Sequence, residues 1–106
     1  MYAYNITFVV DPSKENEIIR YINDDLRPKL FGPESPASNP ELKKVVEAGG
    51  EKPGPDHGLS LALSASFETE ESAHLWNDHI LLPVLGDFHL KFGQHALFFI
   101  TLLEIL

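Results

Sequence analysis

The side chains with the clearest capacity for chemistry in this chain are its histidines. They are His57, His74, His79, His89 and His95. Imidazole ligates metals and serves as a general base near neutral pH. His74 and Asp78 are four residues apart, so on a helix they would share one face and could coordinate a divalent ion. A catalytic zinc needs about three protein ligands plus water, and no third ligand stands at a suitable spacing. We therefore interpret the pair as an ordinary surface contact and predict no metal site and no cofactor.

Nucleophilic catalysis has even less support in the sequence. The chain has no cysteine, which removes thiolate nucleophiles and disulfides. The serines of segment 59–67 form one cluster, but no GxSxG motif surrounds them and no base is placed to activate them. The glycines at 49–50 and 54 precede a predicted strand instead of a helix, so they do not indicate a phosphate site. No catalytic residue can be assigned.

Length and charge restrict the possible partners. The chain has 106 residues, 43% of them hydrophobic, with 16 acidic and 8 basic side chains and a formal net charge of -8. We expect one domain, residues 1–106. Residues 58–106 contain a single lysine, Lys91, and no arginine, which argues against binding to nucleic acid. No apolar run is long enough to span a bilayer, so no membrane partner and a cytoplasmic location are expected.

The first half of the chain predicts a strand followed by a helix. Residues 2–10 alternate aromatic or β-branched side chains with smaller or polar ones, as a half-buried strand does. Asp11 is a suitable N-cap and Pro12 fits the first helical position. Apolar residues then recur at helical spacing, so a helix should run from about Pro12 to the high twenties, disturbed near Pro28. The recurring residues are Ile18, Ile19, Ile22 and Leu26.

The middle of the chain alternates loops and strands. Residues 31–40 contain three prolines and a glycine and are predicted to be a loop. A short strand should follow at residues 42–47. A second loop, residues 48–58, is rich in glycine and proline. Residues 59–67 alternate leucines with small side chains and give the most regular strand pattern in the chain.

The last third predicts a second helix and a final strand. Thr69, followed by two glutamates, is typical of a helix start, and Gly93 of a helix end. Pro83 should kink or interrupt this helix. Its apolar stripe is predicted to be Ala73, Trp76, Ile80 and Val84. Residues 96–106 form an apolar run that should close the chain as a strand.

The resulting order, β-α-β-β-α-β, is that of the ferredoxin-like motif. We predict an α+β fold in which an antiparallel sheet of order 4-1-3-2 carries both helices on one face. The two halves also resemble each other under a shift of 55 positions, which supports this order. The matching pairs are Tyr21 with Trp76, Leu26 with Leu81, Pro28 with Pro83, and Leu30 with Leu85.

The last strand is unusual because it is apolar on both faces. Leu97, Phe99 and Leu103 fall on one face, while Phe98, Ile100 and Leu102 fall on the other. In the predicted sheet order this is an edge strand, which needs a cover. A second copy, packed through the open faces to form a dimeric α/β barrel, is the simplest cover. The predicted interface residues are Ala62, Leu97, Phe99 and Leu103. In the alternative hypothesis, Leu102, Leu103 and Ile105 pack under a loop of the same chain, such as segment 31–40.

Three functional classes follow from this face. The first is a non-enzymatic homodimer that binds a small apolar ligand or a protein partner. Its polar residues would be Asn5, Thr7, Ser60, Ser64 and Thr101, which suit an otherwise apolar pocket. The second is a small enzyme similar to the cofactor-independent oxygenases of the dimeric α/β-barrel group, which would need an inward-pointing histidine or asparagine. The third is a structural subunit without a pocket.

Four short motifs resemble an uncharacterised family of small bacterial proteins, a domain of unknown function. They are Tyr4-Asn5-x-Thr7-Phe8-x-Val10-Asp11, Pro28 within its helix, Lys91-Phe92-Gly93, and Thr101-Leu102-Leu103-Glu104. The resemblance spans nearly the whole chain and implies the ferredoxin-like, dimeric α/β-barrel fold. It implies no activity and no catalytic residues. This chain departs from the family in its long 48–58 connection, and in Ser64, where a glutamine is common.

Overall fold

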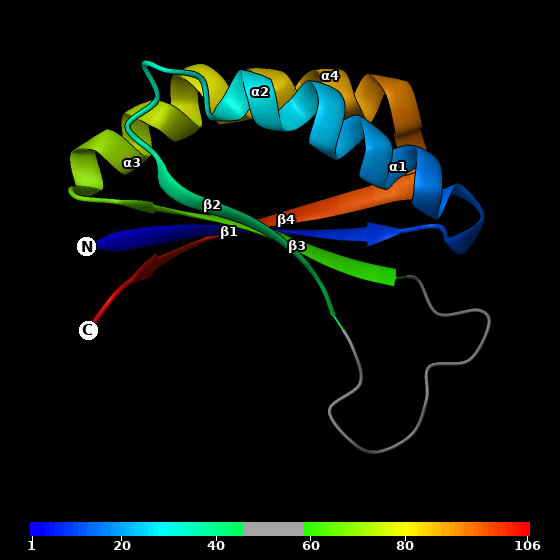
Figure 1. Ribbon diagram of the computed structural model, residues 1–106, viewed down its shortest axis with the longest axis horizontal. Helices are drawn as coiled ribbons and strands as arrows, with labels where there is room; N and C mark the ends of the chain where they lie inside the picture. Colours follow the sequence, from blue (N-terminus) through cyan, green and yellow to red (C-terminus); the bar gives the residue numbers. More distant parts are fainter. Residues whose placement is uncertain (46–58) are drawn as a thin grey trace.

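The computed structural model describes residues 1–45 and 59–106 and shows a four-stranded sheet with helices on one side (Figure 1). The strands are β1 (Tyr2–Val10), β2 (Ser38–Lys44), β3 (Leu59–Phe67) and β4 (Ala96–Glu104). The α-helical segments are α1 (Glu15–Tyr21), α2 (Arg27–Leu30), α3 (Glu70–Trp76) and α4 (Leu82–Phe92). Short 3₁₀ turns, Pro12–Lys14 and Gly93–His95, precede α1 and β4.

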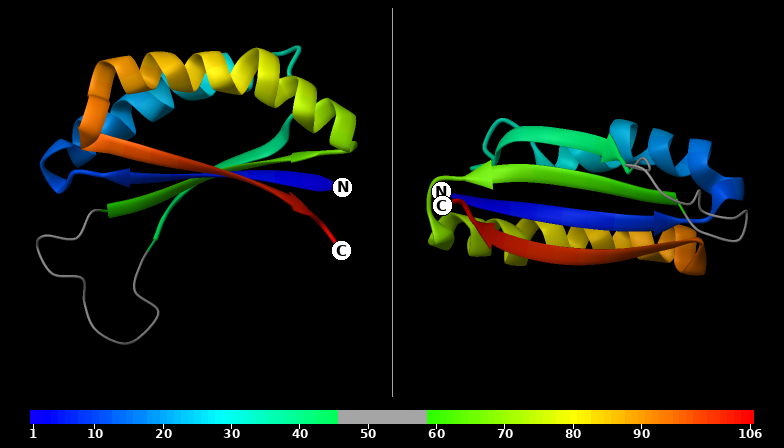
Figure 2. Two further views of the ribbon diagram at one scale, coloured as in Figure 1. Left: turned by 180° about the vertical axis from the view of Figure 1, so that it is seen from behind. Right: turned by 90° about the horizontal axis from the view of Figure 1, so that it is seen from below.

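The sheet is antiparallel with the order β2-β3-β1-β4, which is the predicted 4-1-3-2 order counted from the other edge. Viewed from below, the helix that contains α3 and α4 lies behind β1 and β4, and the helix that contains α1 and α2 lies behind β3 and β2 (Figure 2). The predicted ferredoxin-like fold is confirmed. β4 is an edge strand, as expected.

The core lies between the helices and one face of the sheet, called here the inner face. Alternate residues of the central strands, on that face, are buried because side chains of a strand point to opposite faces in turn. They are Tyr4, Ile6, Phe8 and Val10 of β1 and Leu61, Leu63, Ala65 and Phe67 of β3. Trp76 joins the two helices, since its indole N–H donates to the carbonyl of Leu30 at 3.0 Å. No buried polar or charged residue occurs in the described ranges.

Both helices contain a π-helical segment immediately before an Xaa-Pro pair. The segments are Ile22–Leu26 and Asn77–Leu81, and they are separated by the same 55 positions as the sequence repeat. In each, the N–H of the next residue bonds five residues back, from Arg27 to Ile22 and from Leu82 to Asn77. A proline ring clashes with the carbonyl four residues earlier, so a wider turn lets the helix continue past Pro28 and Pro83.

Because of this π-helical turn, the buried stripe of the second helix differs from the predicted one after Trp76. Ala73 and Trp76 are buried as expected, but Ile80 and Val84 are only partly buried. The wider turn adds one residue, so the buried stripe continues one position later. Its later members are Leu81, Leu85, Phe88 and Phe92. Gly93 ends the helix with φ 54°, a left-handed conformation that favours glycine.

The loop predicted for residues 31–40 and the strand predicted for 42–47 are also corrected. The strand β2 begins at Ser38, inside the proline-rich segment, and ends at Lys44. A register irregularity between Ser38 and Glu41 contains Pro40 and Asn39, whose φ is 52°. A bulge on an edge strand accommodates a proline that cannot donate to the ladder. Residues 46 and 47 of the predicted strand, and the predicted loop 48–58, lie outside the described residues.

We expect Trp76→Phe to lower the free energy of unfolding by about 1–3 kcal/mol, because it removes a buried hydrogen bond and leaves the Leu30 carbonyl without that donor. Urea denaturation followed by circular dichroism measures this change. Leu75→Ala is the control, because the neighbouring Leu75 is half exposed. Substitutions at such surface positions usually change the free energy of unfolding by less than about 0.5 kcal/mol. Equal losses in the two variants would contradict the structural role of the indole.

Candidate functional site

The face of the sheet away from the helices, called here the outer face, brings together all nine residues predicted for ligand binding or dimerisation. The strand register places them in three rows from β3 across β1 to β4. The rows are Ser60–Val9–Leu97, Ala62–Thr7–Phe99 and Ser64–Asn5–Thr101, and Leu103 follows in the next row beside Ala3. Predicting the alternation and the strand order was therefore sufficient to place these side chains on one surface.

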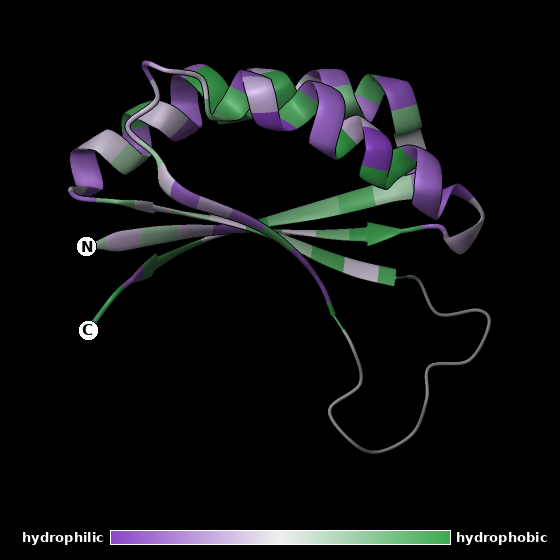
Figure 3. Ribbon diagram, in the orientation of Figure 1, coloured by the Kyte–Doolittle hydropathy of each residue, from purple (hydrophilic) through white to green (hydrophobic). Residues whose placement is uncertain are grey.

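The β4 side of the outer face is apolar and, within the described part of the chain, uncovered. Leu97, Phe99 and Leu103 are 51%, 58% and 49% exposed. Large apolar side chains more often lie inside a folded protein. Figure 3 shows hydrophobic colouring along much of β4. Segment 31–40 leads into β2, at the opposite edge of the sheet, so it does not cover these residues. The alternative hypothesis of a cover by segment 31–40 is wrong for Leu103 and Ile105, since Ile105 is also 49% exposed.

The side chains at the centre of the outer face are small, and several are polar, but none is charged. The amide of Asn5 donates to the hydroxyl of Thr7 at 3.1 Å, so these two neighbours on β1 satisfy part of each other's hydrogen-bonding capacity. Among the described strand residues, charges on this face occur only at its β2 margin, where Lys43 pairs with Glu41 at 2.8 Å. A surface without charge is unusual in a chain of net charge -8. It is typical of the core of a protein interface.

The histidines do not converge on one site in the described part of the chain. His74 contacts Glu70, with 3.4 Å between Nε2 and Oε1, and Asp78 instead accepts a hydrogen bond from Asn77. His74 and His79 are exposed. Within residues 1–45 and 59–106, no three His, Cys, Asp or Glu side chains are grouped closely enough to hold a metal ion. His57 lies outside the described residues.

His95 has a specific partner that sequence reasoning missed. Its Nδ1 lies 3.2 Å from Oδ2 of Asp11, while Oδ1 of Asp11 accepts hydrogen bonds from the backbone N–H and hydroxyl of Ser13. The Ser13 hydrogen bonds, and then the contact with His95, lower the pKa of Asp11 below its usual value of 3.8. The end of β1 and the start of β4 adjoin in the predicted sheet order, so this contact could have been anticipated.

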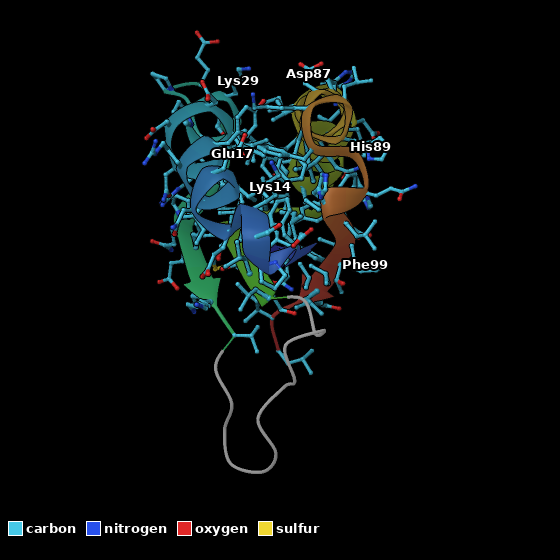
Figure 4. All side chains as sticks on the ribbon, turned by 90° about the vertical axis from the view of Figure 1, so that its right-hand side faces the viewer. Lys14, Glu17, Lys29, Asp87, His89 and Phe99 are labelled. Carbon is cyan, nitrogen blue, oxygen red and sulfur yellow. The ribbon has the colours of Figure 1, made fainter. Side chains whose placement is uncertain are left out.

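His89 lines an apolar cavity that the sequence did not reveal. The cavity has a volume of about 290 Å³ and is bounded by His89 of α4 and by Ala96, Leu97, Phe98 and Phe99 of β4. His89 and Phe99 lie on the same side of the molecule in Figure 4. The helix predicted between Thr69 and Gly93 includes His89, but only the packing of α4 beside β4 brings its imidazole to this strand. The imidazole is exposed, not buried.

These features define a small ferredoxin-like protein with an open, partly apolar sheet face. No family model and no curated protein sequence matches the chain. Solved structures do resemble it. An ethyl tert-butyl ether degradation (EthD) family protein from Bacillus halodurans has a TM-score of 0.62 and 16% identity, with all of both chains covered. A DABB family protein with a ferredoxin-like fold from Mesorhizobium loti has a TM-score of 0.53 and 13% identity, covering 100% of this chain and 99% of that one.

A designed protein, Foldit4, shares the same architecture with a TM-score of 0.56 and 10% identity, covering 99% of this chain and 98% of that one. At such identities the likeness shows the fold alone, and the resemblance to the ferredoxin-like group is confirmed at that level. In the described part of the structure, no helix is both long enough and apolar enough to cross a bilayer.

Asp11→Ala should lower the melting temperature at pH 7, because it removes the helix cap and the contact with His95. The pKa of Asp11 is lowered in the folded state, so its contribution is present above about pH 4 and is lost as pH falls through the folded pKa. The two melting temperatures should therefore converge as the pH falls below the folded-state pKa of Asp11. Asp87→Ala, on the exposed face of α4, is the control. A difference that does not decrease as the pH falls through the acidic range would contradict the assignment.

Proposed function

We propose that this chain is a non-enzymatic interaction module that forms a homodimer through the outer face of its sheet. The observation that carries the proposal is the exposure of Leu97, Phe99 and Leu103 on the β4 side of the outer face, whose centre carries no charge. Exposed apolar side chains that are bordered by polar ones are typical of an interaction surface. A second copy would cover this surface with the same surface of its own, as an isologous interface requires.

The size of the outer face suits a dimer. Four strands of up to nine residues give a face about 30 Å long and about 19 Å wide, at about 3.3 Å per residue and about 4.8 Å per strand. Its outline is therefore about 570 Å², and side chains add accessible area to this value. A standard interface buries about 800 Å² on each partner. The face alone therefore provides most of the area that a stable dimer needs.

The distribution of side-chain sizes also favours self-association. Large side chains lie on β4 and small ones on β3, with β1 between them. A two-fold axis that runs along β1 would place β4 of one copy over β3 of the other. Phe99 and Leu97 would then pack against the partner's Ala62, Ser60 and Ser64. Large residues facing small ones allow two sheets to interdigitate at the usual separation of about 10 Å.

The row formed by Ser64, Asn5 and Thr101 would lie inside this dimer. If the two sheets leave a space there, these side chains would orient a small apolar ligand through a few hydrogen bonds. If the space is filled, the face serves protein interaction alone. The enzyme alternative has less support than the interaction module. It needs an inward-pointing base, and His74 and His79 are exposed.

Phe99→Glu should convert the dimer to a monomer, because it places a charge within the interface, opposite the partner's β3. Light scattering at micromolar concentration should give twice 11.9 kDa for the original chain and 11.9 kDa for the variant. Leu90→Glu adds the same charge at a leucine that is 84% exposed on α4, and it should leave the dimer intact. A single-chain mass for the original protein would refute the proposal.

Ala62→Phe tests the packing of β4 against the partner's β3. The larger ring has open space in an isolated chain, but it would collide with the partner's large side chains. We expect the dissociation constant of the dimer to rise at least tenfold, with little change in the stability of the monomer. Ala62→Ser is the control of similar size. A dimer that tolerates phenylalanine at this position would place the interface elsewhere.

A further inference from the structure

The two edge strands of the sheet differ in their protection against pairing. β2 carries Pro40, a bulge between Ser38 and Glu41, and the charges of Lys43 and Lys44. Natural sheets use these features to prevent the addition of another strand. β4 has nine residues without proline, lysine or a register shift, and its one charge is Glu104 at the end. In the described part of the chain, the free edge of β4 is therefore open to an added strand.

Two hydrogen bonds at the ends of the β1–β4 ladder establish which backbone groups face this edge. The N–H of Asp11 donates to the carbonyl of His95, and the N–H of Ile105 donates to the carbonyl of Met1, both at 2.8 Å. Hydrogen-bonded and non-hydrogen-bonded pairs alternate along an antiparallel ladder. Odd-numbered residues of β4 therefore bond to β1, and the backbone groups directed to the free edge belong to Ala96, Phe98, Ile100 and Leu102.

The apolar cavity lies at this same edge. Leu97 and Phe99 extend on the outer face, whereas Ala96 and Phe98 extend on the inner face, yet all four line one cavity. Only the edge of a strand adjoins both of its faces, and the other edge of β4 is paired with β1. The cavity volume is about 290 Å³. The cavity is apolar and open beside the strand edge, so it can receive an apolar side chain of an added strand.

We propose that the free edge of β4 binds an extended peptide segment as a fifth strand, with an apolar side chain in the cavity beside His89. This goes beyond the proposed dimer, which uses the outer face. Backbone hydrogen bonds would supply affinity and the cavity would supply specificity, as in other cases of strand addition. The chain carries a net charge of -8, so the segment should have lysine or arginine at its flanks.

The probe is a peptide in which three leucines alternate with two threonines between flanking pairs of lysines. It is titrated into the full chain at physiological ionic strength, and calorimetry measures its affinity. Hydrogen exchange measures the protection of the amides of Phe98, Ile100 and Leu102. The control peptide has the same sequence with every central amide N-methylated, which retains the charge and removes the capacity to pair.

Leu102→Pro removes one outward N–H and leaves the ladder with β1 intact, because the Leu102 amide does not bond to β1. Leu102→Ala controls for the loss of the side chain. We expect saturable binding of the probe, slower exchange of the three amides, and affinity at least tenfold lower for Leu102→Pro than for Leu102→Ala. The N-methylated peptide should not saturate. If Leu102→Pro fails to fold, the comparison of the two peptides on the original chain decides the question.

Equal binding of the two peptides would show a merely electrostatic attraction and would overturn the proposal. Slow exchange of the three amides without peptide would also overturn it, because another copy of the chain would then occupy the edge. Light scattering on the same samples separates this result from the proposed function. If the chain is monomeric and binds the probe, the proposed dimer is refuted and the edge site is supported. If the chain is dimeric and does not bind the probe, the edge site is refuted and the dimer is supported.

Discussion

Two helices can cover only one face of a four-stranded sheet, and most of this structure depends on that constraint. Burial of Ile6 and Phe8 on the central strand requires the helices above them, and it leaves Asn5 and Thr7 on the opposite face. The hydrophobic effect therefore determines which face is closed. The same alternation exposes Phe99 on β4, because its neighbours Phe98 and Ile100 already point toward the helices.

The two π-helical segments show how the helices keep their cover over the sheet despite an internal proline. In the second helix, the wide turn at Asn77–Leu81 moves the buried stripe by one position, so that Leu81 and Leu85 face the sheet instead of Ile80 and Val84. The first helix has the same turn 55 positions earlier, at Ile22–Leu26. The repeat in the sequence thus corresponds to a repeated structural feature: a π-helical turn that lets a proline-containing helix pack on a pair of strands.

The outer face and the free edge of β4 are different kinds of surface. The face offers side chains, large on β4 and small on β3, and it suits a flat partner such as a second sheet. The edge offers backbone groups and one cavity beside His89, and it suits an extended segment. The two surfaces share the side chains of Leu97 and Phe99, so occupation of one affects the surroundings of the other.

Sequence alone determined the element order and the residues of the outer face, because period-two alternation and N-cap chemistry are local properties. The strand order followed from the ferredoxin-like motif that this element order matches. Tyr4, Phe99 and Ser64 could be placed on their correct faces without any coordinates. Tertiary structure decided what depends on distant contacts: the start of β2 at Ser38, the shift of the buried stripe to Leu81, the contact of His95 with Asp11, and the cavity beside His89. The contact and the cavity require elements far apart in the chain to pack together, whereas the shifted stripe follows from the wide turn before Pro83, which the helical spacing alone did not indicate.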